Sequence, residues 1–300
     1  MQTKRSAVGA TAPWKEVIVD GVRLAYDDEG AGPVLICLHA IGHGARDFAD
    51  LRGRLADRYR VIAVDWPGQG NSGDDHVPAS ARRYAELLAA FVDDLELGDV
   101  VILGNSIGGG AAIRFAAEHP QKVRALVLAD SAGLVGIDRT VRFFTGMMTR
   151  FFRAGTRGAW WFPRLFRAYY RRVLTQTPAR AQRERLIASA DEIAPILVQA
   201  WQSFGAPEAD LRLLAAGLEC PVLVTWATKD LVIPLARTRP AIERIPHARL
   251  QTFAAGHAAF LECPEEFRVC LEEFLEQTCR AAPALRGVVA FGRPGDAASA

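Results

Sequence analysis

Short, continuously apolar segments alternate with segments of helical periodicity along the first half of the chain. A strand that is apolar on both faces is typical of a parallel sheet covered by helices on both sides. The predicted buried strands are residues 33–38, 60–64, 100–103 and 123–129, and the predicted helices between them are 46–59, 81–97 and 111–118. The pattern therefore predicts an α/β fold with a mostly parallel, helix-covered sheet. An Asp20-Gly21 hairpin between two further strands precedes it.

The alternation stops after Gly133. Residues 134–216 contain no convincing strand pattern, and an apolar stripe with the spacing of one helical face runs through Phe144, Met147, Met148, Phe151 and Phe152. The stretch is also strongly basic, because residues 134–187 hold twelve arginines, no lysine and only two acids. These features predict a helical insertion that is not part of the sheet.

Apolar strands return at residues 221–226 and 249–253, and a terminal helix is predicted at 264–279. The two parts of the strand pattern can then form one sheet, because an insertion between strands does not prevent their pairing. We predict an α/β core of residues 14–133 and 217–280, a helical insertion at 134–216, and flexible tails at 1–13 and 281–300.

The segment Gly104-Asn105-Ser106-Ile107-Gly108 joins a predicted buried strand to a predicted helix. Its Gly-x-Ser-x-Gly spacing suits a sharp turn on which the serine hydroxyl projects out of the sheet, and the two glycines remove side chains that would collide there. The N–H of Ile107 begins the helix, where partial positive charge can stabilise an oxyanion. The pattern indicates a catalytic Ser106, with an idle serine in a glycine-rich turn as the alternative.

A nucleophilic serine needs a base, and the base needs an orienting acid. Two later strand ends supply both residue types, since Asp230 follows the strand at 221–226 and His257 follows the strand at 249–253. The carboxyl ends of parallel strands share one edge of a sheet, so we expect these side chains to meet Ser106 there.

In this order the motifs resemble those of the α/β-hydrolase-fold serine hydrolases, over about residues 15–278. The matching motifs are His39-x-x-Gly42, Asp65-x-x-Gly68-x-Gly70-x-Ser72, the Ser106 elbow, Asp230 with Pro234, and Gly256-His257 with Glu262 and Pro264. The resemblance implies that Ser106 attacks an acyl carbonyl, that His257 is the general base, and that Asp230 orients His257. A histidine base predicts that activity falls below about pH 6–7.

The same resemblance implies an oxyanion hole formed by the N–H groups of Ile107 and Ile41. Ala40 is the alternative to Ile41, because an alanine follows His39 where the family usually has a glycine, and alanine disfavours a positive φ.

Other polar residues near the predicted strand ends have competing interpretations. Asp130 could replace Asp230 as the acid, because it also follows a strand. We expect structural roles for His39 and Asp65 in their loops, and for Glu262 at the entry to the terminal helix.

In this family such an insertion is a cap over the active site. Its apolar side chains are therefore candidates for the lining of a substrate pocket. The candidates from the insertion are Met147, Met148, Phe152 and Trp160, and His43, in the loop after the strand at 33–38, is a further candidate. Packing inside the insertion is the competing interpretation of the aromatic stripe. The arginines form either a solvated face or a surface for anionic lipids or acidic substrates.

Composition excludes several classes of function. A net charge of +2 gives no general argument for nucleic-acid binding, and no run approaches the length of a membrane span. The first 13 residues lack the apolar core of a secretory signal, and the five cysteines lack metal-site spacing. We expect a cytoplasmic protein without a metal or other cofactor, and the oligomeric state stays open.

The predicted function is hydrolysis of an apolar carboxylic ester or lactone through an acyl-enzyme. One alternative is carbon–carbon bond hydrolysis of meta-cleavage products, which the Gly-Asn-Ser-x-Gly-Gly segment at 104–109 resembles. Ala258 after the catalytic histidine, where those enzymes tend to have an aromatic residue, is a departure from that group. A non-catalytic ligand-binding protein with the same fold is the alternative of another class.

Overall fold

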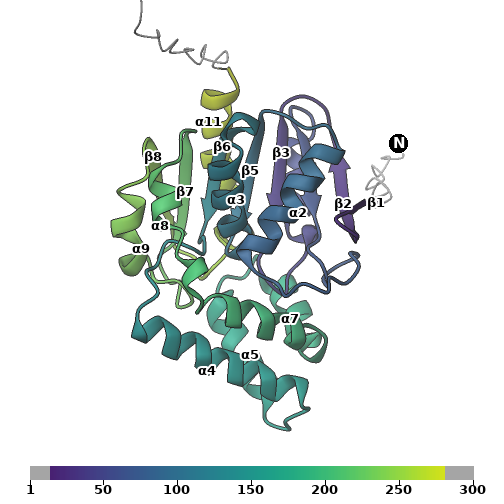
Figure 1. Ribbon diagram of the computed structural model, residues 1–300, viewed down its shortest axis with the longest axis vertical. Helices are drawn as coiled ribbons and strands as arrows, with labels where there is room; N and C mark the ends of the chain where they lie inside the picture. Colours follow the sequence, from purple (N-terminus) through teal and green to yellow (C-terminus); the bar gives the residue numbers. More distant parts are fainter. Residues whose placement is uncertain (1–13, 281–300) are drawn as a thin grey trace, which may run out of the picture.

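The computed structural model describes residues 14–280, so the predicted flexible tails at 1–13 and 281–300 lie outside the described residues. One eight-stranded sheet has the order β1-β2-β4-β3-β5-β6-β7-β8 (Figure 1). Its strands are β1 (Lys15–Val19), β2 (Val22–Glu29), β3 (Val34–Leu38), β4 (Arg60–Val64), β5 (Val100–Asn105), β6 (Val123–Ala129), β7 (Val222–Ala227) and β8 (Ala248–Phe253). Only β1 and β2 run antiparallel to their neighbours, which confirms the predicted mostly parallel sheet.

The central strands are buried on both faces, as their continuous apolar runs predict. All six residues of β5 and all six of β7 are buried. At the antiparallel edge, β1 turns into β2 through Asp20 and Gly21, whose φ angles are +49° and +75°. Two consecutive positive φ angles suit the twist of a two-residue hairpin, so the predicted turn forms.

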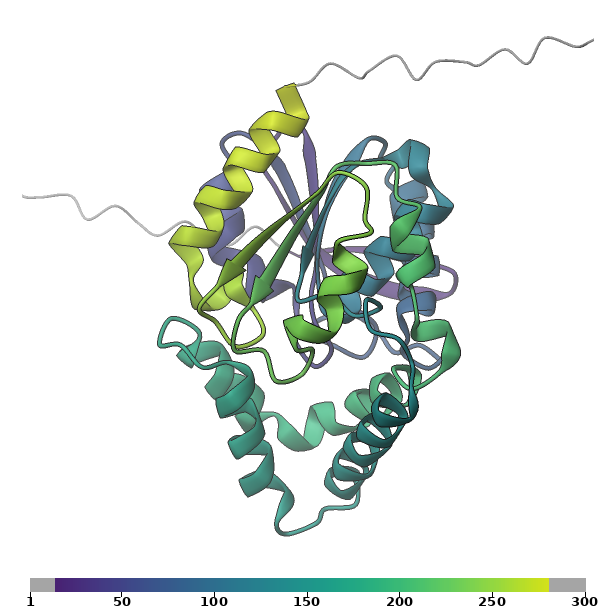
Figure 2. The same cartoon turned by 90° about the vertical axis from the view of Figure 1, so that its left-hand side faces the viewer.

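Helices cover both faces of the sheet (Figure 2). On one face lie α1 (Ala49–Leu55) and α11 (Pro264–Arg280), joined by an ion pair of 2.5 Å between Arg54 and Glu265. The other face carries α2 (Ala81–Asp94), α3 (Ile107–Glu118), α8 (Arg212–Ala216) and α9 (Leu235–Ile242). Short helical turns are η1 (Ala45–Phe48), η2 (Pro120–Lys122), η3 (Pro207–Ala209) and α10 (Ala259–Glu262).

The chain between β6 and β7 is helical and crosses the carboxyl ends of the parallel strands, below the sheet in Figures 1 and 2. Its main helices are α4 (Arg139–Thr156), α5 (Phe162–Val173), α6 (Arg180–Ala188) and α7 (Ala190–Ser203). We call residues 134–216 the helical insertion. It contains no strand, as its sequence predicts, while its division from the rest of the chain as a separate domain stays a prediction.

The aromatic stripe of the helical insertion packs mainly within the insertion itself. Phe152 is fully buried, and its ring lies 6.5 Å from Phe162, 6.3 Å from Phe166 and 6.2 Å from Trp201. Close approach of α4 and α5 depends on Gly155, where a Cβ atom would lie 2.5 Å from the Phe162 ring. These contacts favour the packing interpretation of the stripe. Within residues 14–280, none of the helices has the combination of length and apolarity that a bilayer span needs.

Candidate active site

Ser106 lies on a strained turn between β5 and α3. Its φ and ψ angles are +53° and −117°, a conformation that non-glycine residues rarely adopt. The turn is tight because a Cβ atom on Gly104 would lie 2.5 Å from the carbonyl oxygen of Gly108, and one on Gly108 would lie 2.5 Å from that of Leu38. The glycine spacing therefore has the steric role that the sequence indicates.

His257 and Asp230 form a buried hydrogen-bonded pair. His257 Nδ1 lies 2.8 Å from Asp230 Oδ2, and each residue is at most 5 % exposed. The other carboxylate oxygen of Asp230 accepts hydrogen bonds from the N–H groups of Val232 (2.7 Å) and Ile233 (2.9 Å). With Nδ1–H donated to Asp230, the free nitrogen Nε2 is the basic one.

Asn105 connects the serine turn to the loop that carries His257. Its Nδ2 donates to the carbonyl oxygen of Ala129 (3.0 Å) and to that of His257 (3.2 Å). The residue before Ser106 thus holds the carboxyl ends of β5 and β6 and the histidine loop together. We did not predict this role, because the partners of Asn105 are distant in the sequence.

Glu262 is a second connecting residue that the sequence analysis assigned differently. One of its carboxylate oxygens accepts from the N–H groups of Gly256 (2.8 Å) and His257 (3.0 Å). The other accepts from Thr175 N (2.7 Å), Thr175 Oγ1 (2.9 Å) and Gln176 N (3.0 Å). Glu262 ends α10 and is 2 % exposed, so it joins the histidine loop to the helical insertion instead of forming the entry to the terminal helix.

The loop after β3 holds the second predicted oxyanion donor. Its left-handed residue is Gly42 (φ +78°), whereas Ala40 has no positive φ, so the alanine after His39 causes no strain. The N–H of Gly42 donates to Gln69 Oε1 (2.6 Å). Among the described residues, no protein group accepts a hydrogen bond from the N–H of Ile41 or Ile107, so both N–H groups are available to a ligand. The N–H of Ala40, the alternative donor, is available in the same way.

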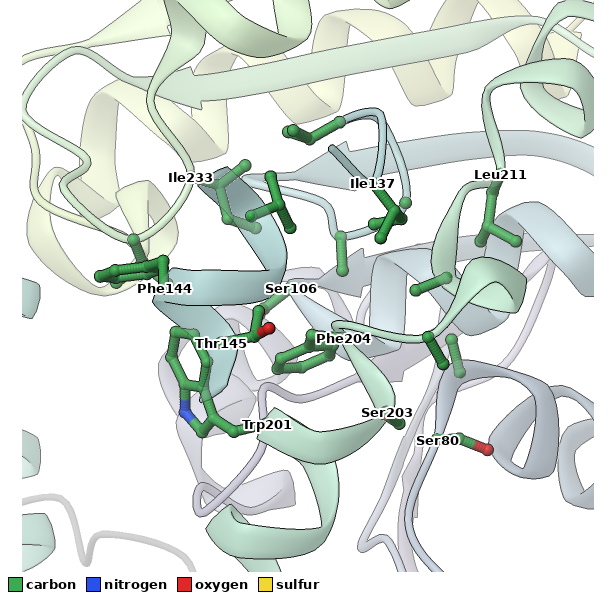
Figure 3. A pocket seen from close by; sticks show the side chains of 18 of the residues that line it. Ser80, Ser106, Ile137, Phe144, Thr145, Trp201, Ser203, Phe204, Leu211 and Ile233 are labelled. Carbon is green, nitrogen blue, oxygen red and sulfur yellow. The ribbon is translucent and has the colours of Figure 1, made fainter. Parts of the chain in front are cut away.

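A cavity of about 470 Å³ reaches Ser106 from the side of the helical insertion. Figure 3 shows Ser106 with Phe144 of α4, Trp201 of α7 and Ile233 of the loop after β7 around it. Most of the remaining wall is apolar and includes Val135, Ile137, Val141, Phe204, Leu211 and Val232. Arg82, Glu208 and Arg237 are the charged lining residues. The helical insertion and the sheet thus enclose an apolar space beside the serine.

The comparisons with known proteins agree with this arrangement. The sequence model of the alpha/beta hydrolase fold matches residues 33–264. The chain belongs to this family. It is 28 % identical over 294 residues to a 2-hydroxy-6-oxononadienedioate/2-hydroxy-6-oxononatrienedioate hydrolase of Burkholderia vietnamiensis, covering 89 % of this chain and 96 % of the relative. An uncharacterised protein of Mycobacterium tuberculosis is 26 % identical over 275 residues, covering 87 % of this chain and 80 % of that protein.

Among solved structures, an esterase from Exiguobacterium antarcticum superposes with a TM-score of 0.77 at 22 % identity. The match covers 87 % of this chain and 98 % of the esterase. At that identity the likeness concerns the fold.

Within this α/β-hydrolase, Asp130 is a third buried acid beside the His257–Asp230 pair. One oxygen of the Asp130 carboxyl group accepts from Ala227 N (2.7 Å), and the other is buried with no hydrogen-bond partner among the described residues. Polar atoms of Asp130, Asp230 and His257 all lie within 4.8 Å of one another. Both oxygens of Asp230 already accept hydrogen bonds, and Asp130 acts on the His257–Asp230 pair through its charge.

The charges in this cluster change its protonation equilibria. Burial disfavours the imidazolium of His257, but the carboxylates of Asp230, Asp130 and Glu262 stabilise it more, and the pKa of His257 rises to about 9. Burial and the neighbouring Asp230 raise the pKa of Asp130 to about 8. His257 is therefore more strongly protonated at neutral pH than an ordinary histidine. An activity that needs neutral His257 should already decline below about pH 9, and not only below pH 6–7.

His39 and Asp65 have structural roles, in line with the sequence interpretation. His39 Nδ1–H donates to the Ala40 carbonyl oxygen (2.7 Å), and its Nε2 accepts from Trp66 N (2.9 Å). Burial lowers the pKa of His39, which keeps the ring neutral. Asp65 accepts from Ala45 N (2.7 Å) and Asn71 N (2.8 Å), and so joins two loops at the carboxyl edge of the sheet.

The five predicted pocket residues, His43, Met147, Met148, Phe152 and Trp160, do not line the cavity at Ser106. His43 is bound to Asp47 (2.5 Å), and Phe152 is enclosed in the aromatic core of the helical insertion. Met147 and Trp160 face solvent, with 44 % and 79 % of their surface exposed. The lining of this cavity differs from the predicted set because the packing of α4 on α7 turns Phe144 and Thr145 toward Ser106, and helical periodicity alone does not reveal which face turns inward.

Proposed function

We propose that this α/β-hydrolase is a serine hydrolase that cleaves a carboxylic ester or lactone through an acyl-enzyme intermediate. The observation that carries the proposal is the strained Ser106 turn, which the side chain of Asn105 links to the backbone of His257, beside the buried His257–Asp230 pair. This arrangement supplies the nucleophile, the base and the orienting acid of acyl transfer.

In the proposed reaction, His257 Nε2 takes the proton of the Ser106 hydroxyl as the oxygen attacks the substrate carbonyl carbon. The N–H groups of Ile107 and Ile41 donate to the oxyanion of the tetrahedral intermediate. His257 then protonates the leaving alkoxide, and the alcohol departs. Water, deprotonated by His257, attacks the acyl-enzyme and releases the acid and free Ser106.

The helical insertion acts as a cap in this proposal, over a core of residues 14–133 and 217–280. Support comes from the cavity, since α4 and α7 supply one of its walls and Ser106 lies in another. Its volume of about 470 Å³ and apolar lining suit a small or medium apolar acyl or alcohol group.

A fluorophosphonate probe tests the proposal directly, because it reacts with an activated serine. We expect the probe to label the wild-type protein and not Ser106→Ala. Ser203→Ala is the matched control, since Ser203 lines the same cavity from α7 and should not affect labelling. An unlabelled wild-type protein would contradict the enzyme proposal and favour a ligand-binding protein.

Carbon–carbon bond hydrolysis is a second candidate, favoured by the Burkholderia vietnamiensis relative and by the Gly104-Asn105-Ser106 segment. A panel of p-nitrophenyl esters of increasing chain length, one lactone and one meta-cleavage product separates the two reactions. We expect turnover of the esters or the lactone, and a preference for the meta-cleavage product would reverse the assignment.

A further inference from the structure

The outer side of helices α4 and α5 exposes large apolar side chains. Phe143 and Met147 lie one helical turn apart on α4 and are 72 % and 44 % exposed. Trp160, in the turn between the helices, is 79 % exposed, and Leu165 of α5 is 53 % exposed. We call α4, α5 and the turn between them the outer hairpin. Soluble proteins seldom expose several such side chains together without a function.

The outer hairpin is also strongly cationic. Nine of its arginines have no carboxylate within ion-pair distance among the described residues: Arg139, Arg142, Arg150, Arg153, Arg157, Arg164, Arg167, Arg171 and Arg172. Arginines elsewhere are commonly paired, such as Arg60 with Asp28 and Arg83 with Asp75. The positive charge of the outer hairpin is therefore not neutralised locally.

The position of the outer hairpin suits contact with an extended surface. In Figures 1 and 2 it forms the end of the molecule opposite α11, and the turn that carries Trp160 projects farthest. On α4, Phe143 and Met147 point outward, while Phe144 and Thr145 line the cavity at Ser106. The outward face is thus free of the contacts that build the cavity.

We propose that the outer hairpin binds the surface of an anionic phospholipid bilayer, with Trp160 and Phe143 inserted among the lipids. Guanidinium groups pair with headgroup phosphates, and an exposed tryptophan prefers the boundary between headgroups and acyl chains. The combination of arginines with apolar side chains on one side of a helix is typical of interfacial binding. A nucleic acid would use the arginines but would leave Phe143, Met147 and Leu165 without apolar contacts.

Vesicle co-sedimentation tests the proposal without reference to enzymatic activity. We expect the wild-type protein to bind phosphatidylglycerol vesicles and not phosphatidylcholine vesicles. Raising NaCl from about 0.1 M to about 1 M, which shortens the Debye length from about 10 Å to about 3 Å, should weaken binding by at least about tenfold. Absence of binding at low salt, or binding to a DNA duplex but not to vesicles, would overturn the proposal.

Matched variants assign the binding to the outer hairpin. We expect Phe143→Ala combined with Trp160→Ala to reduce binding by about tenfold or more, and Arg150→Ala combined with Arg153→Ala to do the same. The controls are Leu213→Ala, an apolar residue 90 % exposed on α8, and Arg239→Ala with Arg244→Ala, two exposed arginines outside the insertion. Equal losses in the controls would contradict the assignment, and thermal melting confirms that each variant is folded.

Insertion of Trp160 has its own optical signal. Brominated lipids quench tryptophans that enter the acyl region, so quenching of the wild-type protein should exceed that of Trp160→Phe. Equal quenching in the two proteins would show that Trp160 stays outside the bilayer.

Discussion

At the scale of single residues, the electrostatics of the site depend on three buried acids around one histidine. Asp230 binds His257 directly, Asp130 lies beside both, and Glu262 binds the backbone of the histidine loop. Together they stabilise the imidazolium more than burial destabilises it, and the pKa of His257 rises to about 9. In the proposed reaction, the same negative charges would stabilise the imidazolium in the transition state and the protonated form of His257 in the free protein.

This balance predicts an alkaline pH dependence. Since the base must be neutral and its pKa is about 9, kcat/KM should increase roughly tenfold per pH unit between about pH 7 and 8 and level off above about pH 9. Asp130→Asn removes one negative group, so the inflection should move to lower pH and the ratio of activity at pH 7 to that at pH 9 should increase. Initial rates with a p-nitrophenyl ester measure both effects.

Asp47→Asn is the control for this experiment, because Asp47 is buried against His43 and not against His257. The interpretation of Asp130 fails if its substitution leaves the inflection in place, or if Asp47→Asn moves it equally.

At the scale of elements, helix α4 has two faces with different surroundings. Phe144 faces the cavity and contacts Trp201 at a ring distance of 5.5 Å, whereas Phe143 beside it is 72 % exposed. The sequence places Phe144 in the apolar stripe of this helix and leaves its neighbour Phe143 outside it. Their separation depends on the packing of α4 against α7.

The two phenylalanines provide a matched pair for substrate selectivity. Phe144→Ala should enlarge the cavity and increase kcat/KM for long-chain relative to short-chain p-nitrophenyl esters by about tenfold, since each added methylene gains apolar contact. Phe143→Ala should leave this ratio unchanged for soluble esters. If this ratio of kcat/KM values is the same in Phe144→Ala as in Phe143→Ala, Phe144 of α4 does not contact the substrate.

At the scale of the whole molecule, Glu262 connects two parts of the chain that are far apart in the sequence. Its carboxylate accepts hydrogen bonds from the histidine loop and from Thr175 and Gln176 of the helical insertion. Glu262 thus links the helical insertion to the loop that carries His257. The predicted cytoplasmic location is a separate matter and stays a prediction.

Removal of this link should affect stability and catalysis together. Glu262→Ala leaves several buried N–H groups without an acceptor, which should reduce the free energy of unfolding by roughly 3–5 kcal/mol. A displaced His257 should also lower kcat by up to about a hundredfold with a small change in KM. Glu262→Gln retains an acceptor oxygen, so its free energy of unfolding and its kcat should fall less than those of Glu262→Ala. Urea unfolding and steady-state kinetics measure the two quantities. Equal losses in the two variants would argue against a hydrogen-bonding role.

Local patterns in the sequence were sufficient to predict the sheet and to place the candidate site residues directly after the ends of its strands. Continuously apolar runs identify buried parallel strands, and Ser106, Asp230 and His257 each follow one, so their placement at one edge of the sheet follows from the shared carboxyl edge. The glycines at 104 and 108 could be explained in advance, because the steric demand of the turn is local.

Tertiary structure alone decided the features that depend on contacts between distant segments. Asn105 meets His257 across 152 positions, and Glu262 meets Thr175 across 87, distances at which sequence periodicity carries no information. The lining of the cavity at Ser106 could not be predicted for the same reason: periodicity defines an apolar stripe on α4, but the packing of neighbouring helices determines which side chains face Ser106 and which remain at the surface.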